Sequence, residues 1–163
     1  MAKLSTIEVH PVPGARSTSR AVAYLVFDGE TGVDAWPVLN RMDQATYQSA
    51  IAERRNVWGR FHNWVSGLAR HEYHHGWPDD PEFSMGYVFR WDHQRQHRRL
   101  YGFLMSPRLR FEVCVLCSFR VKEKWQTETA VKKLVRAMSQ HAGVQQAVRN
   151  AFKQDGGGAW DVH

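Results

Sequence analysis

The alternation of apolar and polar residues along the chain predicts a short first strand followed by helices. Residues 21–27, AVAYLVF, are β-prone and end in a turn-rich stretch. Asp34 is expected to cap a short helix that reaches Leu39. Asp43 is expected to cap a longer helix, in which apolar residues recur at near-helical spacing as far as Trp64. The longer helix should lay one face on a sheet.

Three β-prone runs and a final helix follow a polar stretch at residues 67–85, which we expect to be a loop. The runs predict an antiparallel meander and are GYVFRW at residues 86–91, RRLYGFLM at 98–105 and FEVCVLCSF at 111–119. Thr127 and Glu128 then open an amphipathic helix whose apolar stripe includes Val131 and Val135. The order predicts an α+β fold with an N-terminal strand and helices, a three-strand antiparallel meander and a C-terminal helix. Helices should cover one face of the sheet and leave the other face free for a ligand.

One domain accounts for most of the chain. With 163 residues the sequence is long enough for one sizeable core and short for two, so we expect a domain at residues 21–152. Residues 1–20 lack periodicity and residues 153–163 contain the run GGG, so both ends are expected to be flexible. No apolar run approaches the roughly 18 residues of a membrane span, and we expect a cytoplasmic protein with no membrane partner.

Neither the cysteines nor the histidine-rich loop predicts a metal site, and no cofactor is expected. Cys114 and Cys117 lie three apart within an apolar strand, so they should point to opposite faces as buried structural residues. His71 and His75 would share one face of a helix and could hold a metal with a carboxylate. Their segment is better explained as a solvated loop.

The positive charge of the protein is concentrated in the meander and the helix after it. Residues 86–136 carry a net charge of +8, from twelve Lys or Arg against four Asp or Glu, whereas the whole chain carries +6. Clustered Lys and Arg suit a polyanion, because they neutralise phosphates and release counterions; a solvated charged surface is the alternative. Interleaved aromatic residues suit stacking on unpaired bases. We therefore expect RNA binding through Arg90, Arg95, Arg99, Arg120, Lys124 and Trp125, although Trp125 could equally be a hydrophobic staple before the helix.

Four places in the chain resemble the RelE-like and HigB-like toxins of bacterial type II toxin-antitoxin systems and their phage-derived relatives. They are the strand-turn-helix AYLVFDGETGVDAWPVLNRMD, the arginine and tyrosine of RRLYGF, the strand FEVCVLCSF running into the basic RVKEK, and the helix start TETAVKKL. Together they lie within residues 21–138. The resemblance implies a RelE-like fold for the α+β domain.

The resemblance also implies an endoribonuclease that cuts messenger RNA, on the ribosome or free of it, and that a cognate antitoxin neutralises. A ribose 2′-OH would attack the adjacent phosphate without a metal, while cations stabilise the charge and an acid and a base move the protons. Arg98 matches the arginine of the family's third strand and would clamp the phosphate. Lys122 matches one lysine of the pair that follows the family's fourth strand, and the other position falls on Val121 or Arg120.

His93 and His97 are the candidates for proton transfer. Histidine titrates near neutral pH and both lie in the turn between two basic strands; the alternative is that each is an exposed turn residue. Tyr101 could stack on a base, support the arginine or belong to the core. Arg98 and Tyr101 are three apart in a strand and should point to opposite faces unless a bulge intervenes, so Arg99 is a substitute for Arg98.

Two other classes of function fit the same residues. The first is a non-catalytic phage or mobile-element module, such as an anti-defence protein, that binds a nucleic acid or a host protein. The second is a protein-interaction domain whose basic face meets an acidic partner. Toxicity on expression would separate the toxin from both.

Overall fold

A computed structural model of the chain describes residues 6–68, 73–76, 83–122 and 129–153, apart from the Lys122 side chain. Its strands are β1 (Ile7–Arg16), β2 (Arg20–Phe27), β3 (His74–Gly76), β4 (Gly86–His93), β5 (Gln96–Arg108) and β6 (Phe111–Lys122). Its helices are α1 (Ala35–Asp43), α2 (Gln48–Val65), α3 (Thr129–Gln140) and α4 (Ala142–Ala151). Within the described ranges, no helix has the length and apolarity that a membrane crossing requires.

The strands form one six-stranded mixed sheet in the order β1-β2-β6-β5-β4-β3. β2 runs parallel to β6, and every other neighbouring pair is antiparallel. The predicted RelE-like α+β fold, a three-strand meander after one N-terminal strand, is therefore wrong. The three predicted runs do lie in β4, β5 and β6, but the sheet continues on both sides of them.

The strand β1 lies within residues 1–20, which we expected to be flexible. Ile7 and Val9 alternate with Glu8 and His10, which is the period of a strand with one face on the core. Pro11 obscured this signal, because proline is normally excluded from a central strand. β1 is an edge strand, where a residue without an N–H is tolerated.

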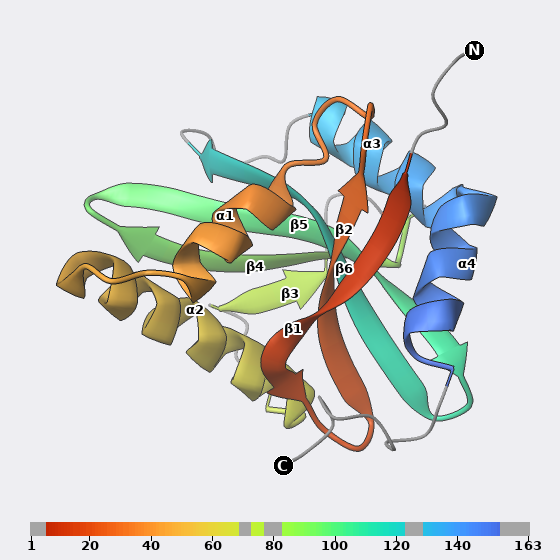
Figure 1. Ribbon diagram of the computed structural model, residues 1–163, viewed down its shortest axis with the longest axis horizontal. Helices are drawn as coiled ribbons and strands as arrows, with labels where there is room; N and C mark the ends of the chain where they lie inside the picture. Colours follow the sequence, from red (N-terminus) through yellow and green to blue (C-terminus); the bar gives the residue numbers. More distant parts are fainter. Residues whose placement is uncertain (1–5, 69–72, 77–82, 123–128, 154–163) are drawn as a thin grey trace.

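Helices cover both faces of the sheet, so the prediction of one face left free was wrong. Figure 1 shows α1 and α2 (orange and yellow) on one side of the molecule and α3 and α4 (blue) on the other. One apolar cluster joins sheet residues such as Ala23 and Val115 to Val135 and Val148 of α3 and α4. A second joins the opposite sheet face to residues of α1 and α2, including Phe61.

The apolar composition of β6 explains the two covered faces. Val115 and Cys117 belong to the α3/α4 side, whereas Cys114 and Leu116 belong to the α1/α2 side. A strand that reads as a continuous apolar run is typical of a sheet buried on both faces. The prediction that Cys114 and Cys117 are buried on opposite faces is confirmed, and burial raises the pKa of both thiols, which keeps them unreactive.

The C-terminal helix is two helices that meet at His141. The His141 ring accepts hydrogen bonds through Nδ1 from the backbone N–H groups of Gly143 (3.0 Å) and Val144 (3.4 Å), and so caps α4. A Cβ at Gly143 would lie 2.8 Å from Cδ1 of Ile7. The missing side chain therefore lets α4 approach the edge strand β1 closely.

Replacing Gly102 by alanine should destabilise the sheet. Gly102 lies at a register shift between β5 and β6, and its Cβ would be 2.1 Å from the carbonyl oxygen of Val115. Relief of this overlap must move backbone, so we expect a loss of about 3 kcal/mol in the free energy of unfolding, measured in urea. The control is Gly59→Ala in α2, where nothing lies within 4 Å, and it should gain about 0.5–1 kcal/mol. Equal stabilities for the two variants would contradict the register.

Candidate nucleic-acid interface

Three arginines lie side by side on neighbouring strands, one each on β4, β5 and β6. The backbone of Arg90 is opposite that of Arg99, and Arg99 is opposite Arg120. Directly opposite residues in antiparallel strands have Cα atoms about 4.5–5.5 Å apart. The three side chains, which we call the arginine row, therefore form a short line of positive charge perpendicular to the strands.

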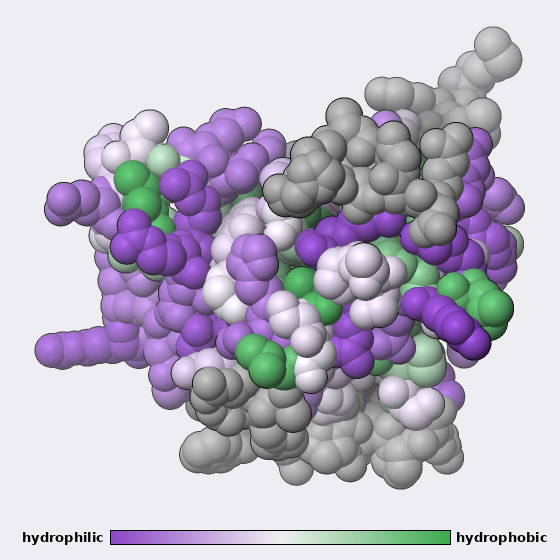
Figure 2. Space-filling model, turned by 90° about the horizontal axis from the view of Figure 1, so that it is seen from below, coloured by the Kyte–Doolittle hydropathy of each residue, from purple (hydrophilic) through white to green (hydrophobic). Residues whose placement is uncertain are grey.

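The arginine row begins where the apolar core of the α3/α4 side ends. Val88 and Tyr101 are buried in that core; Arg90 lies two residues after Val88 on β4, and Arg99 lies two residues before Tyr101 on β5, each on the same face. All three arginines are partly exposed. Figure 2 shows mostly hydrophilic side chains at the left of the view, the end of the molecule where the β4–β5 hairpin lies in Figure 1.

The row has one carboxylate partner for three positive charges. Arg120 donates to Asp34 at 2.9 Å, whereas neither Arg90 nor Arg99 forms an ion pair with any residue in the described part of the chain. Within the described ranges, the guanidinium of Arg90 lies 3.5 Å from Nε2 of His75. Burial and the charge of Arg90 lower the pKa of Arg99, and the carboxylate of Asp92 only partly opposes them. Like charges directly opposite each other destabilise a sheet, so this face favours a bound anion.

Asp34 does not cap α1 through its side chain, contrary to the sequence prediction. Its carboxylate accepts from the backbone N–H of Phe119 (2.8 Å), and its own N–H donates to the carbonyl of Cys117 (3.0 Å). Asp34 thus bonds to the edge of β6 just past the part of that strand that pairs with β2. It holds Arg120 in place at one end of the row.

A hydrogen-bonded acid and histidine lie beside the row. Asp92 and His97 are opposite each other on β4 and β5, and Oδ1 of Asp92 is 2.7 Å from Nδ1 of His97. They share the face of Arg90 and Arg99, which are two residues away on the same strands. Because Nδ1 is engaged, the imidazole presents Nε2 to solvent. The arrangement can orient a proton-transfer group next to fixed positive charge.

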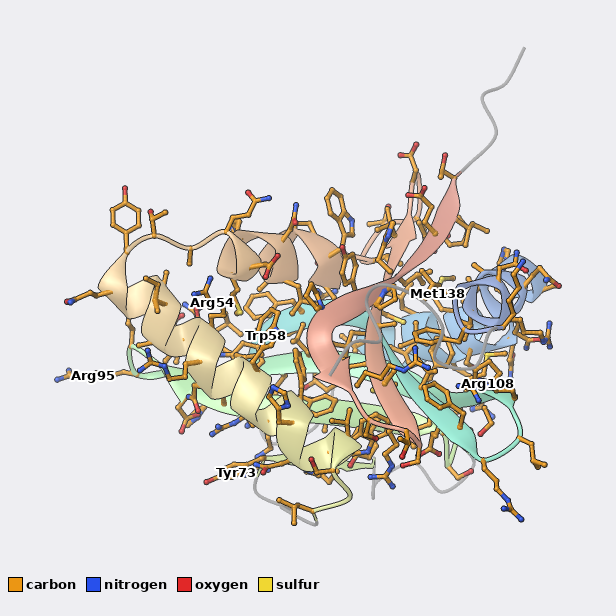
Figure 3. All side chains as sticks on the ribbon, turned by 60° about the horizontal axis from the view of Figure 1, so that its bottom comes forward. Arg54, Trp58, Tyr73, Arg95, Arg108 and Met138 are labelled. Atoms are coloured by element: carbon orange, nitrogen blue, oxygen red, sulfur yellow. The ribbon has the colours of Figure 1, made fainter. Side chains whose placement is uncertain are left out.

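The other predicted residues of this region are distributed around the end of the hairpin. The backbone of Lys122 pairs with that of His97. Arg95 lies at the hairpin tip and points away from the body of the protein (Figure 3). Lys124 and Trp125 lie outside the described residues, as does His71.

Arg98 and His93 face the other side of the sheet, toward α2. Arg98 donates to Oε2 of Glu53 at 2.8 Å, and the same oxygen accepts from Nε1 of Trp91, also at 2.8 Å. Oε1 of Glu53 is 4.0 Å from Nε2 of His93. Glu53 is 8% exposed, so Arg98 neutralises a buried carboxylate. Of the four predicted catalytic residues, His97 thus lies beside the row and Arg98 and His93 lie on the α2 side, whereas only the backbone of Lys122 is described.

Sequence reasoning did not find the three carboxylates that organise these sites. Asp92 lies five residues before His97, a spacing that puts two residues opposite each other across a two-residue turn. The spacing of Asp92 and His97 in the sequence could therefore have predicted this pair. Glu53 was hidden within a helix and Asp34 was assigned to a cap, and neither spacing indicates the strand residue that each one contacts.

Comparisons with protein-family models, with curated proteins and with solved structures found no match to this chain. The resemblance to RelE-like and HigB-like toxins therefore stays a prediction. Among the described residues there is no group of three or more His, Cys, Asp or Glu that could hold a metal ion.

Replacing Arg98 should destabilise the protein, whereas replacing the adjacent Arg99 should leave its stability almost unchanged. Arg98→Ala leaves Glu53 buried without its cation, and we expect a loss of about 2–3 kcal/mol in the free energy of unfolding in urea. Arg99→Ala removes a charge that lies opposite two others, so its stability should stay within about 0.5 kcal/mol of wild type.

A double replacement supplies the control for this prediction. Glu53→Leu with Arg98→Met exchanges the ion pair for apolar contacts and should cost less than the two single changes added together. A harmless Arg98→Ala would show that Arg98 is not needed to neutralise Glu53.

Proposed function

We propose that the protein binds single-stranded RNA on the arginine row and cleaves it there without a metal. The observation that carries the proposal is the position of the Asp92–His97 pair beside Arg90 and Arg99 on one half-exposed face. Cations for the phosphate and a group for proton transfer are both needed to cleave RNA. Here they occur together.

The row is suited to bind the sugar-phosphate backbone. Each guanidinium presents a planar set of donors that matches two phosphate oxygens, and Arg90 and Arg99 have no carboxylate partner among the described residues. An incoming phosphate would also relieve the repulsion between them. Arg99 therefore takes the clamp that the resemblance assigned to Arg98, since Arg98 is engaged with Glu53.

In the proposed reaction, Nε2 of His97 takes the proton of the ribose 2′-OH. The 2′-oxygen attacks the adjacent phosphorus, the bond to the 5′-oxygen breaks, and a cyclic phosphate forms. Asp92 holds the ring through Nδ1 and stabilises the imidazolium that results. Lys122, whose backbone is opposite that of His97, is our candidate for protonating the leaving 5′-oxygen.

The remaining predictions about partners depend on this activity. A ribonuclease of this kind in the cytoplasm would need a neutralising antitoxin. A partner that supplies carboxylates to the arginine row would block the site, because it would compete with phosphate. Messenger RNA, on the ribosome or free, is the proposed substrate.

RNA binding without cleavage is the second candidate, and the exposure of the acid-histidine pair favours it. The side chains of His97 and Asp92 are 63% and 70% exposed, and an ion pair in water contributes little. The arginine row alone suffices for binding. In this second function the protein binds RNA at the same interface but does not cleave it.

Loss of the two unpaired arginines should weaken RNA binding and its salt dependence together. For Arg90→Ala with Arg99→Ala, the slope of log affinity against log salt should fall by about 0.7 for each arginine, measured by anisotropy with a labelled single-stranded RNA. The control is Arg41→Ala with Arg55→Ala on α1 and α2, which removes the same charge from exposed positions. An equal loss in both double variants would show that net charge alone determines binding.

Replacement of His97 should separate cleavage from binding. We expect His97→Gln to bind RNA like wild type and to cut it about 10²–10⁴ times more slowly, and Asp92→Asn to be impaired less. New RNA 5′ ends and growth arrest after tightly induced expression are the readouts. His93→Gln, on the α2 side, is the control and should cut normally. Intact RNA with soluble wild-type protein would reject cleavage and leave the binding module.

A further inference from the structure

The tip of the β4–β5 hairpin consists of two long side chains in a backbone conformation that favours small residues. Gln94 has φ of 50° and Arg95 has φ of 64°, and the flanking residues His93 and Gln96 are paired. A two-residue turn with positive φ at both positions is the type I′ turn, for which Asn-Gly is the preferred sequence. The turn is therefore less stable with Gln94 and Arg95 than it would be with Asn-Gly.

The contact between Arg98 and the buried Glu53 holds the hairpin just behind its tip, and a second hydrogen bond joins the two strands on the other face. On the α2 side, Arg98 donates to Gln96 at 2.9 Å and to Glu53 at 2.8 Å. On the other side, Asp92 and His97 form their 2.7 Å hydrogen bond. A projecting hairpin fixed in this way can present a side chain without losing much conformational freedom on binding.

Arg95 is the side chain that this hairpin presents. It is exposed, it contacts no carboxylate in the described ranges of the chain, and it points outward from the tip in Figure 3. Arg99 lies four positions after Arg95, which corresponds to about 13 Å along a strand. A strand of RNA on the arginine row would pass the tip within a few nucleotides of the phosphate that the row holds.

We infer that Arg95 recognises an unpaired guanine in the RNA held by the arginine row, an inference that rests on the proposed function. The guanidinium fork matches the two acceptors, O6 and N7, on one edge of guanine. Unpaired RNA exposes that edge, whereas the deep, narrow groove of duplex RNA hides it. Arg95 would thus determine sequence preference, and the arginine row would bind the backbone of any sequence.

The chain contains a matched control for both the charge and the strain of Arg95. Arg110 is also exposed and also has positive φ, at 59°, in the turn between β5 and β6. That turn is at the other end of the β5 strand from the tip. Glycine at either position relieves the backbone and removes one positive charge, but only the change at Arg95 removes the proposed contact.

The test compares Arg95→Gly with Arg110→Gly on two RNAs. Affinities are measured for a short guanine-containing single-stranded RNA and for the same RNA with 7-deazaguanine, which lacks the N7 acceptor. We expect wild type and Arg110→Gly to bind the modified RNA about tenfold more weakly. Arg95→Gly should bind both RNAs equally, at the weaker level. Both glycine variants should melt about 2–4 °C higher than wild type, which shows that any lost affinity is not lost folding.

The possible results separate this inference from the proposed function. Equal wild-type affinity for the two RNAs overturns the role of Arg95 while RNA binding stands. Loss of discrimination in Arg110→Gly also overturns it, because the effect would then follow charge and not the tip. No wild-type binding to either RNA rejects the proposed function and this inference together. Arg95→Lys keeps the charge and loses the fork, so discrimination should fall even though the salt dependence is retained.

Discussion

The carboxylate of Glu53 is the interaction on which the hairpin half of the molecule depends. It lies on α2, is nearly buried, and accepts hydrogen bonds from Trp91 on β4 and Arg98 on β5. A buried carboxylate is costly unless it is paired and hydrogen-bonded, so this contact fixes α2 and both strands relative to each other. The ring of Trp91 packs in the apolar cluster below, which extends the same connection into the core.

This ion pair gives the two sides of the hairpin different roles. On the α2 side, the positive charge of Arg98 is neutralised within the protein. On the opposite side, Arg90 and Arg99 form no ion pair with the carboxylates of the described residues, and the strands, supported from the α2 side, hold the two arginines at fixed spacing. Because strand residues alternate between faces, Arg98 neutralises a buried carboxylate on one face, whereas Arg99 presents its charge on the other.

Local patterns in the sequence predicted the individual strands better than their arrangement. The apolar runs of β2, β4, β5 and β6 were recognised because each contains consecutive β-prone residues. The edge strand β1 was missed because its prolines hide an alternating pattern, and β3 was missed because three residues carry no periodicity. The parallel pairing of β2 with β6 has no local signal. At the candidate site, residue types indicated the basic segment, and the parity of β5 had already made Arg99 the substitute for Arg98. The contact between Glu53 and Arg98 could not be predicted, since it joins a helix to a strand far along the chain.

The pairing of β2 with β6 has a consequence for how the protein is made. Arg20 lies next to Glu112 in the sheet, so the hairpin of β1 and β2 has no further strand beside β2 until β6 has been made. Contacts between distant parts of a chain form slowly, because the long loop between them must first close. The β4–β5–β6 meander, which carries the arginine row, is local and can pair early, but α3 and α4, which cover the inner part of its face, are made after it. During synthesis the basic face would therefore form on strands that α2 already supports, and the apolar sheet surface next to it would stay exposed until α3 and α4 have been made.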